Sequence, residues 1–273
     1  MTDVSGGWRE LEDELAAWQA AGRTATLWWR DDDAVEPTPA LERLLDLAAR
    51  NRVPIALAVI PARASHRLPA YLADADGQPS LLQHGFAHQN HAGEGQKKIE
   101  LGGTRTIGET REALARGTAI MGALFPTRDG ASTALPVLVP PWNRIDEELP
   151  AALPELGFTG LSTHGPRPVP QTVPGLRQVN THVDIMRWAA PRGFLGVTES
   201  LGQLTRHLEA RRSSTVDAEE PSGLLTHHLA HDEPAWRFLE ELLPRLMAHL
   251  AVRFQSAEEV FSETGEAKAG QRS

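Results

Sequence analysis

The sequence predicts an α/β fold with a largely parallel sheet, and two observations carry that prediction. Short apolar runs typical of buried strands alternate along the chain with segments of helical periodicity. This β-then-α order is typical of parallel strands joined by right-handed crossovers, in a barrel or in an open, doubly wound sheet. With 273 residues the chain can bury a large core, and α/β barrels of this size are usually one domain. We therefore expect a single domain.

The alternation begins with a helix. Apolar residues recur at helical spacing from Trp8 to Trp18, and Gly22 is placed to end this helix. The first strand is predicted at 26–29 because its residues are apolar and favour β structure. Since the helix precedes this strand, we interpret residues 1–23 as a helical cap.

The remaining elements follow the same order, and we interpret residues 24–262 as the main domain. Thr38-Pro39 begins the next helix, because proline fits the first helical turn. Further strands are predicted at 54–60, 81–83, 135–139, 158–162, 176–183 and 223–226. Further helices are predicted at 106–124, 145–156 and 198–211. Loops are predicted at 93–103 and 165–175, and the polar tail 263–273 is predicted to be disordered.

Composition excludes several classes of protein. A formal net charge of −9 and a pI near 5.7 argue against the basic surface that nucleic acids require. The chain has no cysteine, so a bound metal would have to be held by histidine, aspartate, glutamate or water. No run approaches the roughly 18 apolar residues of a membrane span, and the first residues lack the pattern of an export signal. We therefore expect a cytoplasmic protein that binds neither nucleic acid nor membrane.

Side chains that can bind metals or catalyse reactions follow five of the predicted strands. The carboxyl ends of parallel strands lie on the same edge of a sheet, where active sites form. One carboxylate and two neutral histidines can hold a divalent metal and leave positions open for water, which is a common basis for hydrolysis. The five segments are 31–33, 84–88, 140–143, 181–184 and 227–231. We therefore expect them to form one shared site.

The order of these segments resembles the polysaccharide deacetylase superfamily, whose catalytic region is the NodB homology domain. The resemblance extends over about residues 24–232. It implies a single-domain, distorted and incomplete (β/α) barrel. The shared motifs are an Asp-Asp strand end, the H-x-x-x-H pattern of His84 and His88, a Pro-Pro-aromatic turn at 140–142, the D-x-x-x-W pattern of Asp184 and Trp188, and a Leu-Leu-x-His strand end at 224–227.

The resemblance implies a metal site. In the family an Asp-Asp pair supplies a catalytic base followed by a metal ligand, and the two histidines complete the site. Carried across, Asp32 is the base, while the metal ligands are Asp33, His84 and His88. Because three aspartates occur in succession, Asp31 and Asp32 remain the other possible pair. Zinc is the expected metal, although these ligands also accept cobalt, nickel or iron.

The resemblance also implies a general acid and a substrate-binding surface. In the family the aspartate of the D-x-x-x-W motif orients a histidine that acts as general acid, and here these residues are Asp184 and His227. Trp142 and Trp188 are expected to enclose the methyl of an acetyl group. Asn143, in the same turn as Trp142, is also expected to contact the substrate.

One motif departs from the family pattern. Val139 occupies the position where the family has an arginine that pairs with the catalytic base. Arg30, just before the aspartate run, and Arg144, just after the turn, are the nearest replacements in sequence. A guanidinium beside the base favours its carboxylate form. Elsewhere, Lys98 and Glu100 lie in a predicted loop, where we expect a solvated run of charges.

Each of these motifs alone is common in ordinary caps and turns, so their order and their placement at strand ends carry the functional prediction. We predict a metal-dependent hydrolase that removes N-acetyl groups from an amino sugar or glycan. One alternative is a metal-dependent amidase that acts on a C–N bond outside sugars. The other is a catalytically silent glycan-binding protein, which the absent motif arginine suggests. The expected partner is a carbohydrate or another small amide, and the sequence does not specify the oligomeric state.

Overall fold

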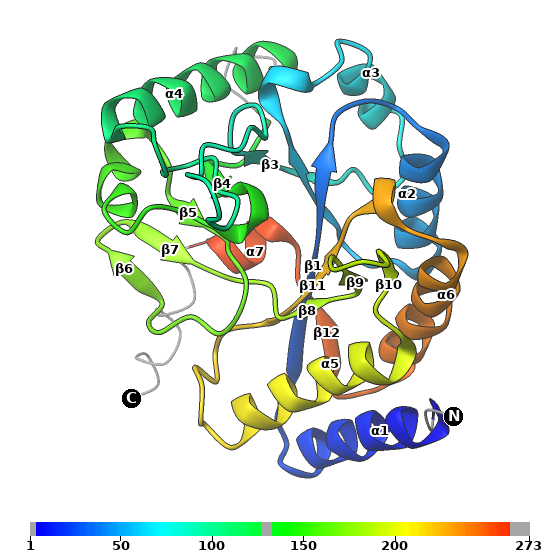
Figure 1. Cartoon of the computed structure of the whole chain (residues 1–273). Helices are drawn as coiled ribbons and strands as arrows, with labels where there is room; N and C mark the ends of the chain where they lie inside the picture. Colours follow the sequence, from blue (N-terminus) through cyan, green and yellow to red (C-terminus); the bar gives the residue numbers. More distant parts are fainter. Residues whose placement is uncertain (1–3, 127–132, 263–273) are drawn as a thin grey trace, which may run out of the picture.

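The computed structural model describes residues 4–126 and 133–262, and in these residues ten strands form one curled sheet (Figure 1). All pairs of neighbouring strands are parallel except the last at one edge, where β6 runs antiparallel to β7. In order across the sheet, the strands are β6 (Gln171–Val173), β7 (Leu176–Gln178), β5 (Gly160–Leu161), β4 (Val137–Val139), β3 (Ser80–His84), β2 (Ala56–Val59), β1 (Ala25–Ala34), β11 (Ser222–Thr226) and β8 (Val183–Asp184), with β12 (Val252–Phe254) also paired to β1. The predicted parallel α/β fold is therefore confirmed, and the sheet is a distorted, incomplete barrel.

Helices surround this sheet, and short turns and a small hairpin connect its strands (Figure 1). The described helices are α1 (Val4–Ala20), α2 (Pro39–Asn51), α3 (Leu68–Ala73), α4 (Ile107–Leu124), α5 (Val197–Arg212), α6 (Glu233–Ala248) and α7 (Ala257–Phe261). The described 3₁₀ turns are η1 (Pro61–Arg63), η2 (Pro141–Asn143), η3 (Leu149–Ala152), η4 (Pro154–Leu156) and η5 (His228–Ala230). The hairpin consists of β9 (Met186–Arg187) and β10 (Gly193–Phe194).

Local capping explains where two of the predicted helices begin. The Thr38 side chain accepts the backbone N–H of Leu41 (3.1 Å), and Pro39 occupies the first position of α2. Helix α4 begins with a capping box, in which the side chains of Thr106 and Glu109 each accept the other residue's backbone N–H. Both starts agree with the sequence prediction.

Several segments differ from their prediction. The single strand predicted at 176–183 is wrong, because β7 and β8 are separate strands that lie near opposite ends of the strand order. The helix predicted at 145–156 is wrong, because Pro150 and Pro154 remove the donors of a continuous helix and leave the two turns η3 and η4. The loop predicted at 165–175 contains the edge strand β6. Helix α6 was not predicted, and it buries Trp236, Leu239 and Leu243. The predicted disordered tail, 263–273, lies outside the described residues.

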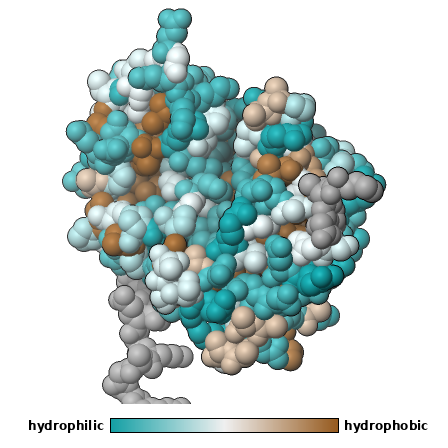
Figure 2. Space-filling model, turned by 60° about the horizontal axis from the view of Figure 1, so that its bottom comes forward, coloured by the Kyte–Doolittle hydropathy of each residue, from teal (hydrophilic) through white to brown (hydrophobic). Residues whose placement is uncertain are grey.

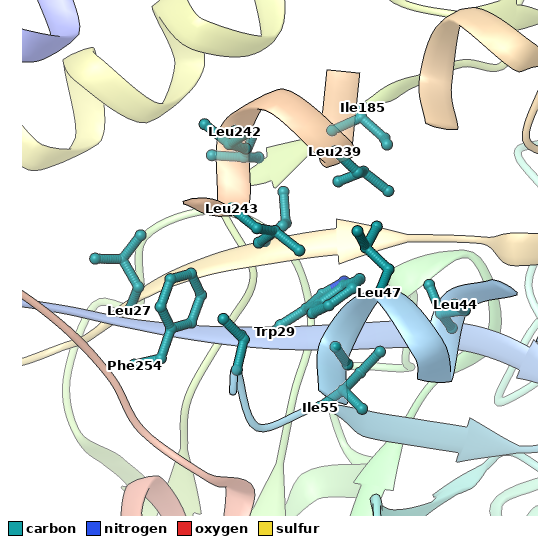
Figure 3. Close-up of a cluster of buried hydrophobic side chains, with 14 of the residues drawn as sticks. Leu27, Trp29, Leu44, Leu47, Ile55, Ile185, Leu239, Leu242, Leu243 and Phe254 are labelled. Carbon is teal, nitrogen blue, oxygen red and sulfur yellow. The ribbon is translucent and has the colours of Figure 1, made fainter. Parts of the chain in front are cut away.

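The sheet separates two apolar layers. On its outer side, Leu27 and Trp29 of β1 pack against side chains of α2 and α6 (Figure 3). On its inner side, Trp28 packs with Ala56 of β2 and Val139 of β4. Because side chains alternate along a strand, the next residues of β1 must also point to opposite sides. Arg30 and Asp32 therefore continue the inner side of the sheet, and Asp31 continues the outer side.

Helix α1 lies outside the sheet, against α5 (Figure 1). The Trp18 indole is buried there and donates to the carbonyl of Leu208 in α5 (3.2 Å). No helix in the described part of the chain combines the length and the apolar character needed to cross a membrane. The face shown in Figure 2 is mainly hydrophilic, with separate hydrophobic patches.

Candidate functional site

A β-bulge at the end of β1 decides how the three aspartates are arranged. The register between β1 and β2 shifts between Asp31 and Ala34, and Asp33 has a left-handed backbone with φ of 74°. The bulge interrupts the alternation, so Asp33 can face the same site as Asp32. Asp31 remains on the outer side of the sheet. The sequence left this register open, and the structure places the pair Asp32 and Asp33 at the site.

Asp33 is the centre of a cluster that fits a divalent metal. Its Oδ1 lies 3.3 Å from Nε2 of His84 and 3.3 Å from Nε2 of His88, and this oxygen is buried without a normal hydrogen bond. The Nδ1 of His84 lies 2.9 Å from the carbonyl of Val139, to which it donates, so the lone pair of that ring is on Nε2. Burial opposes ionisation of Asp33, but the two imidazoles hold the pKa of its carboxyl below the usual range. One carboxylate and two imidazoles suit zinc and similar metals.

His88 lies in the loop after β3, whereas His84 is the last residue of that strand. Its backbone is left-handed, with φ of 56°, and its ring lies 4.3 Å from that of Trp142, centroid to centroid. Burial, and then the neighbouring His84, lower the pKa of His88, which favours the neutral form that binds metals. Trp142 itself also has a left-handed backbone, with φ of 55°. The η2 turn therefore supports one side of the cluster.

Arg30 supplies the guanidinium that the motif lacks at Val139. It is completely buried and binds Asp32 through two hydrogen bonds, from Nε to Oδ1 (2.8 Å) and from Nη2 to Oδ2 (2.9 Å). Its remaining donors bind Ser162 and the side-chain oxygen of Asn143 (2.6 Å). The amide oxygen of Asn143, expected at the substrate, therefore binds Arg30.

Arg144, the other replacement considered from the sequence, lies elsewhere. It donates to the carbonyl of Lys98 (2.9 Å). Among the described residues, Arg30 is the arginine that pairs with Asp32, and no ion pair joins Arg144 to Asp32.

His227 follows directly after β11, and its ring approaches Asp32. Its Nε2 is 4.0 Å from Oδ2 of Asp32, and the Trp188 ring packs edge-on against its ring at 4.6 Å. The expected contact with Asp184 takes a different form. Asp184 accepts hydrogen bonds from the Trp188 indole (2.7 Å) and from the backbone N–H of Met186 (2.9 Å), and no described hydrogen bond joins it to His227. Trp188 therefore lies between the two residues, since it donates to Asp184 and packs against His227.

Asp31 forms a separate buried pair with His228 on the outer side of the sheet. The Asp31 carboxylate lies 2.5 Å from Nδ1 of His228 and also accepts that residue's backbone N–H (3.0 Å) and the hydroxyl of Thr226 (2.7 Å). Burial opposes both charges, but each partner stabilises the other, so the pKa of Asp31 is lowered and that of His228 is raised. This pair holds the backbone directly after His227.

Two residues near the cluster lie outside the predicted set. His164 follows β5, and its Nδ1 lies 3.3 Å from the hydroxyl of Thr181. Burial lowers the pKa of His164, and the charge of Asp184 opposes this effect. Since His164 also follows a strand of the sheet, the rule that selected the other segments could have found it. Glu100, expected in a solvated run, is instead completely buried, and nothing in its local sequence indicates this.

A second group of possible ligands lies near the amino ends of β8 and β11, in which atoms of His182, His207 and Glu220 lie within 4.8 Å of one another. The Nδ1 of His182 accepts the backbone N–H of Gly223 (3.0 Å), so the proton of the neutral ring lies on Nε2, 3.3 Å from the Glu220 carboxylate. A protonated nitrogen has no lone pair for a metal. We therefore assign this group to the core.

The two histidines of this group make stability depend on pH. Their rings stack with centroids 3.5 Å apart. Burial, and then neighbouring cationic groups, lower the pKa of His207 to about 2 and that of His182 well below its usual value. In the unfolded chain both pKa values return to about 6.5, so the unfolded state binds more protons below this pH. The groups that face the pair are His164, Arg167, Arg211 and Glu220.

We expect the free energy of unfolding to decrease as the pH falls below about 6.5, by about 1.4 kcal/mol per pH unit for each of the two histidines. His207→Asn removes one proton-binding group and keeps a polar group near Ser222, which lies 2.9 Å from Nδ1 of His207. The variant should be less stable at pH 8 but should show a shallower pH dependence. Urea unfolding at a series of pH values measures this slope, and an unchanged slope would contradict the assignment.

Among the comparisons with known proteins, those with solved structures agree on the fold. No family model and no curated protein matches the sequence. Among solved structures, a putative polysaccharide deacetylase from Mycobacterium smegmatis matches over 88% of this chain and 90% of its own, with 14% identity and a TM-score of 0.58. The family 4 carbohydrate esterase PdaA from Bacillus subtilis matches over 87% and 80%, with 15% identity and a TM-score of 0.51.

A third solved structure carries a metal. It is a family 4 acetyl xylan esterase from Clostridium thermocellum in complex with a cobalt ion, which matches over 86% of this chain and 90% of its own, with 13% identity and a TM-score of 0.50. The chain therefore has the distorted barrel fold of polysaccharide deacetylases and family 4 carbohydrate esterases, as the order of its motifs predicts.

Proposed function

We propose that the protein is a metal-dependent hydrolase that removes an N-acetyl group from an amino sugar or glycan. The observation that carries this proposal is the cluster of Asp33, His84 and His88 directly beside Asp32, whose carboxylate is held by Arg30. A metal site and a fixed carboxylate next to each other are the parts that amide hydrolysis needs. The likeness of the fold to that of deacetylases and esterases supports the same reaction class.

Each residue has a role in this reaction. A divalent metal held by Asp33 and the two histidines would supply Lewis acidity, polarising the amide carbonyl and favouring deprotonation of water. Asp32 accepts the proton of the attacking water as the C–O bond forms. A backbone N–H near Trp142 stabilises the negative charge on the former carbonyl oxygen. His227 donates a proton to the leaving nitrogen as the C–N bond breaks.

Two tryptophans flank this arrangement, and we expect them to contact the methyl of an acetyl group. Trp142 packs against His88, and Trp188 packs against His227, so an apolar ring lies beside both the metal cluster and the acid. Trp188 is 43% exposed, which leaves part of its ring available to a larger substrate. Because Arg30 supplies a guanidinium to Asp32, the absent motif arginine no longer favours a catalytically silent protein.

The activity is tested with the purified protein, supplied with zinc or cobalt. Release of acetate from N-acetylglucosamine and its oligomers should be measured beside hydrolysis of ureides and cyclic amides. We expect turnover of the acetylated sugars. Turnover of the ureides or cyclic amides alone would favour the non-sugar amidase, and tight glycan binding without any turnover would favour a silent protein.

The metal site is tested separately, by elemental analysis. His84→Ala and His88→Ala should each lose bound metal, because each removes a ligand nitrogen. Asp33→Asn should weaken metal binding, because it removes the negative charge of the carboxylate. Asp32→Asn should keep the metal but lose turnover. His249→Ala, at the end of α6, is the matched control and should retain both. Wild-type metal content in both His84→Ala and His88→Ala would overturn the ligand assignment.

A further inference from the structure

We infer that Glu100 is a positioning residue that fixes the loop carrying His88 and thereby sets the affinity of the site for its metal. This inference rests on the proposed metal site. Glu100 lies outside the motifs, twelve residues beyond His88 in a connection without regular helix or strand. Its side chain is nevertheless completely buried, and its carboxylate accepts three backbone hydrogen bonds.

The Glu100 carboxylate accepts backbone N–H groups of a turn that is neither helix nor strand. Strand β3 ends at His84, and the following backbone turns away from the sheet. Glu100 accepts three N–H groups of this turn, from Phe86 (3.0 Å), Ala87 (2.8 Å) and Gln89 (3.2 Å). An ionised carboxylate makes strong hydrogen bonds of this kind, and buried N–H groups need partners. The three donors lie on both sides of His88 in the sequence.

His88 needs such support because its own backbone is unfavourable. A left-handed φ of 56° is rare for a residue with a side chain, and it persists only where the surroundings hold it. The Nε2 of His88 reaches Asp33 from this conformation, at 3.3 Å. If the three N–H groups lost their acceptor, the loop could relax and carry the imidazole away from Asp33.

The Glu100 carboxylate is packed so closely against Gly85 that no side chain fits at this position. Gly85 has φ of 54°, and a Cβ at this position would collide with the Glu100 carboxylate and with the Pro141 ring. On its own side, Glu100 is anchored by the next residue, because Leu101 forms a bridge with Ile145 just beyond η2. Glu100 therefore joins the loop after β3 to the turn after β4, and these two segments carry His88 and Trp142.

The test uses the full-length protein freed of metal, with zinc as the probe. Glu100→Gln keeps the size of the side chain but replaces one acceptor oxygen with a donor that faces N–H groups. We expect its zinc affinity, measured by competition calorimetry, to be about 10-fold to 100-fold weaker than that of the wild type, a range typical of residues that orient metal ligands. The visible spectrum of bound cobalt should also differ between Glu100→Gln and the wild type, because His88 would coordinate the metal differently.

Glu220→Gln is the matched control. Glu220 is also a completely buried carboxylate, and it accepts two backbone N–H groups, from Arg167 (2.9 Å) and Asn180 (2.9 Å), but it lies in the core group away from Asp33. We expect this variant to lose stability while keeping the zinc affinity and the cobalt spectrum of the wild type. The comparison separates a local effect on His88 from a general loss of stability.

Three outcomes decide the inference. Weaker zinc binding in Glu100→Gln, with wild-type binding in Glu220→Gln, supports it. Equal zinc affinity and equal cobalt spectra in folded Glu100→Gln and wild type overturn it, and leave the proposed function standing. Absence of metal binding in the wild type overturns both. If Glu100→Gln does not fold, Glu100→Asp takes its place, and its shorter carboxylate should give an intermediate loss of affinity.

Discussion

Replacement of His227 by alanine is expected to lower kcat by about 10²-fold to 10⁴-fold, because an amine leaves poorly unless it is protonated as the C–N bond breaks. The ring lies 4.0 Å from Asp32 and is not part of the metal cluster, so the variant should keep its metal and its fold. Steady-state acetate release, with metal content measured on the same sample, gives both quantities.

Two comparisons make this expectation specific. Asp184→Asn should lose only part of the activity, because Asp184 contacts Trp188 rather than His227 itself. His164→Ala should retain most of it. Near-normal turnover in His227→Ala would refute the assignment, and a collapse in His164→Ala would then place the acid at the end of β5. A collapse in His228→Ala, with His227→Ala active, would place it one residue further along.

Replacement of Arg30 by methionine is expected to destabilise the fold by about 3–5 kcal/mol, because it leaves the buried Asp32 carboxylate without its partner. Arg30 and Asp32 are both almost fully buried, so water cannot take over the lost hydrogen bonds. The double variant Arg30→Met/Asp32→Asn should recover much of this loss, since the uncompensated charge is then absent. Denaturant unfolding of the two single variants and the double variant measures the coupling.

The outcome that contradicts this prediction is additive destabilisation, with the double variant less stable than either single variant. Arg30→Lys distinguishes charge from geometry. An ammonium group keeps the positive charge but cannot bind both carboxylate oxygens as the guanidinium does, so we expect it to restore stability only in part. Its turnover should also stay below that of the wild type, because Asp32 is held less firmly.

The positions of several site residues could be predicted from the sequence, because they depend on local rules such as the alternation of side chains along a strand. If the alternation of β11 continues past its last residue, Thr226, then His227 and His228 point to opposite sides of the sheet. The structure places one beside Asp32 and the other against Asp31. The placement of the candidate segments at strand ends was likewise predictable, since the order of strands and helices is visible in the sequence.

The register of the aspartates was not predictable in this way. It depends on a bulge in the pairing of β1 with β2 and on a left-handed backbone at Asp33, and aspartate alone does not require either. The helix expected at 145–156 is a different case. Pro150 and Pro154 stand in the sequence, and greater weight on them would have predicted the break.

Two of the buried charged residues, Arg30 and Glu100, show why other parts could not be predicted. A charged residue is normally exposed, because burial costs free energy unless partners compensate it. The partners of Arg30 include Ser162 and Asn143, more than a hundred residues away in sequence, and those of Glu100 are backbone groups that carry no sequence signal. Only the folded arrangement identifies such partners.

The left-handed residues of the site have a consequence for protein engineering. Asp33, His88, Trp142 and Asn143 all have positive φ, a conformation that costs roughly 1–3 kcal/mol for residues other than glycine and less for aspartate and asparagine. A screen for higher melting temperature would therefore favour glycine at His88 and Trp142, whereas glycine at Asn143 would leave the buried Arg30 without an acceptor. Each change at His88 or Trp142 would remove a ligand or a ring from the site. Selection for heat resistance and selection for turnover would act against each other here, most strongly at Trp142 and His88, and a thermostable variant is better sought in the outer helices.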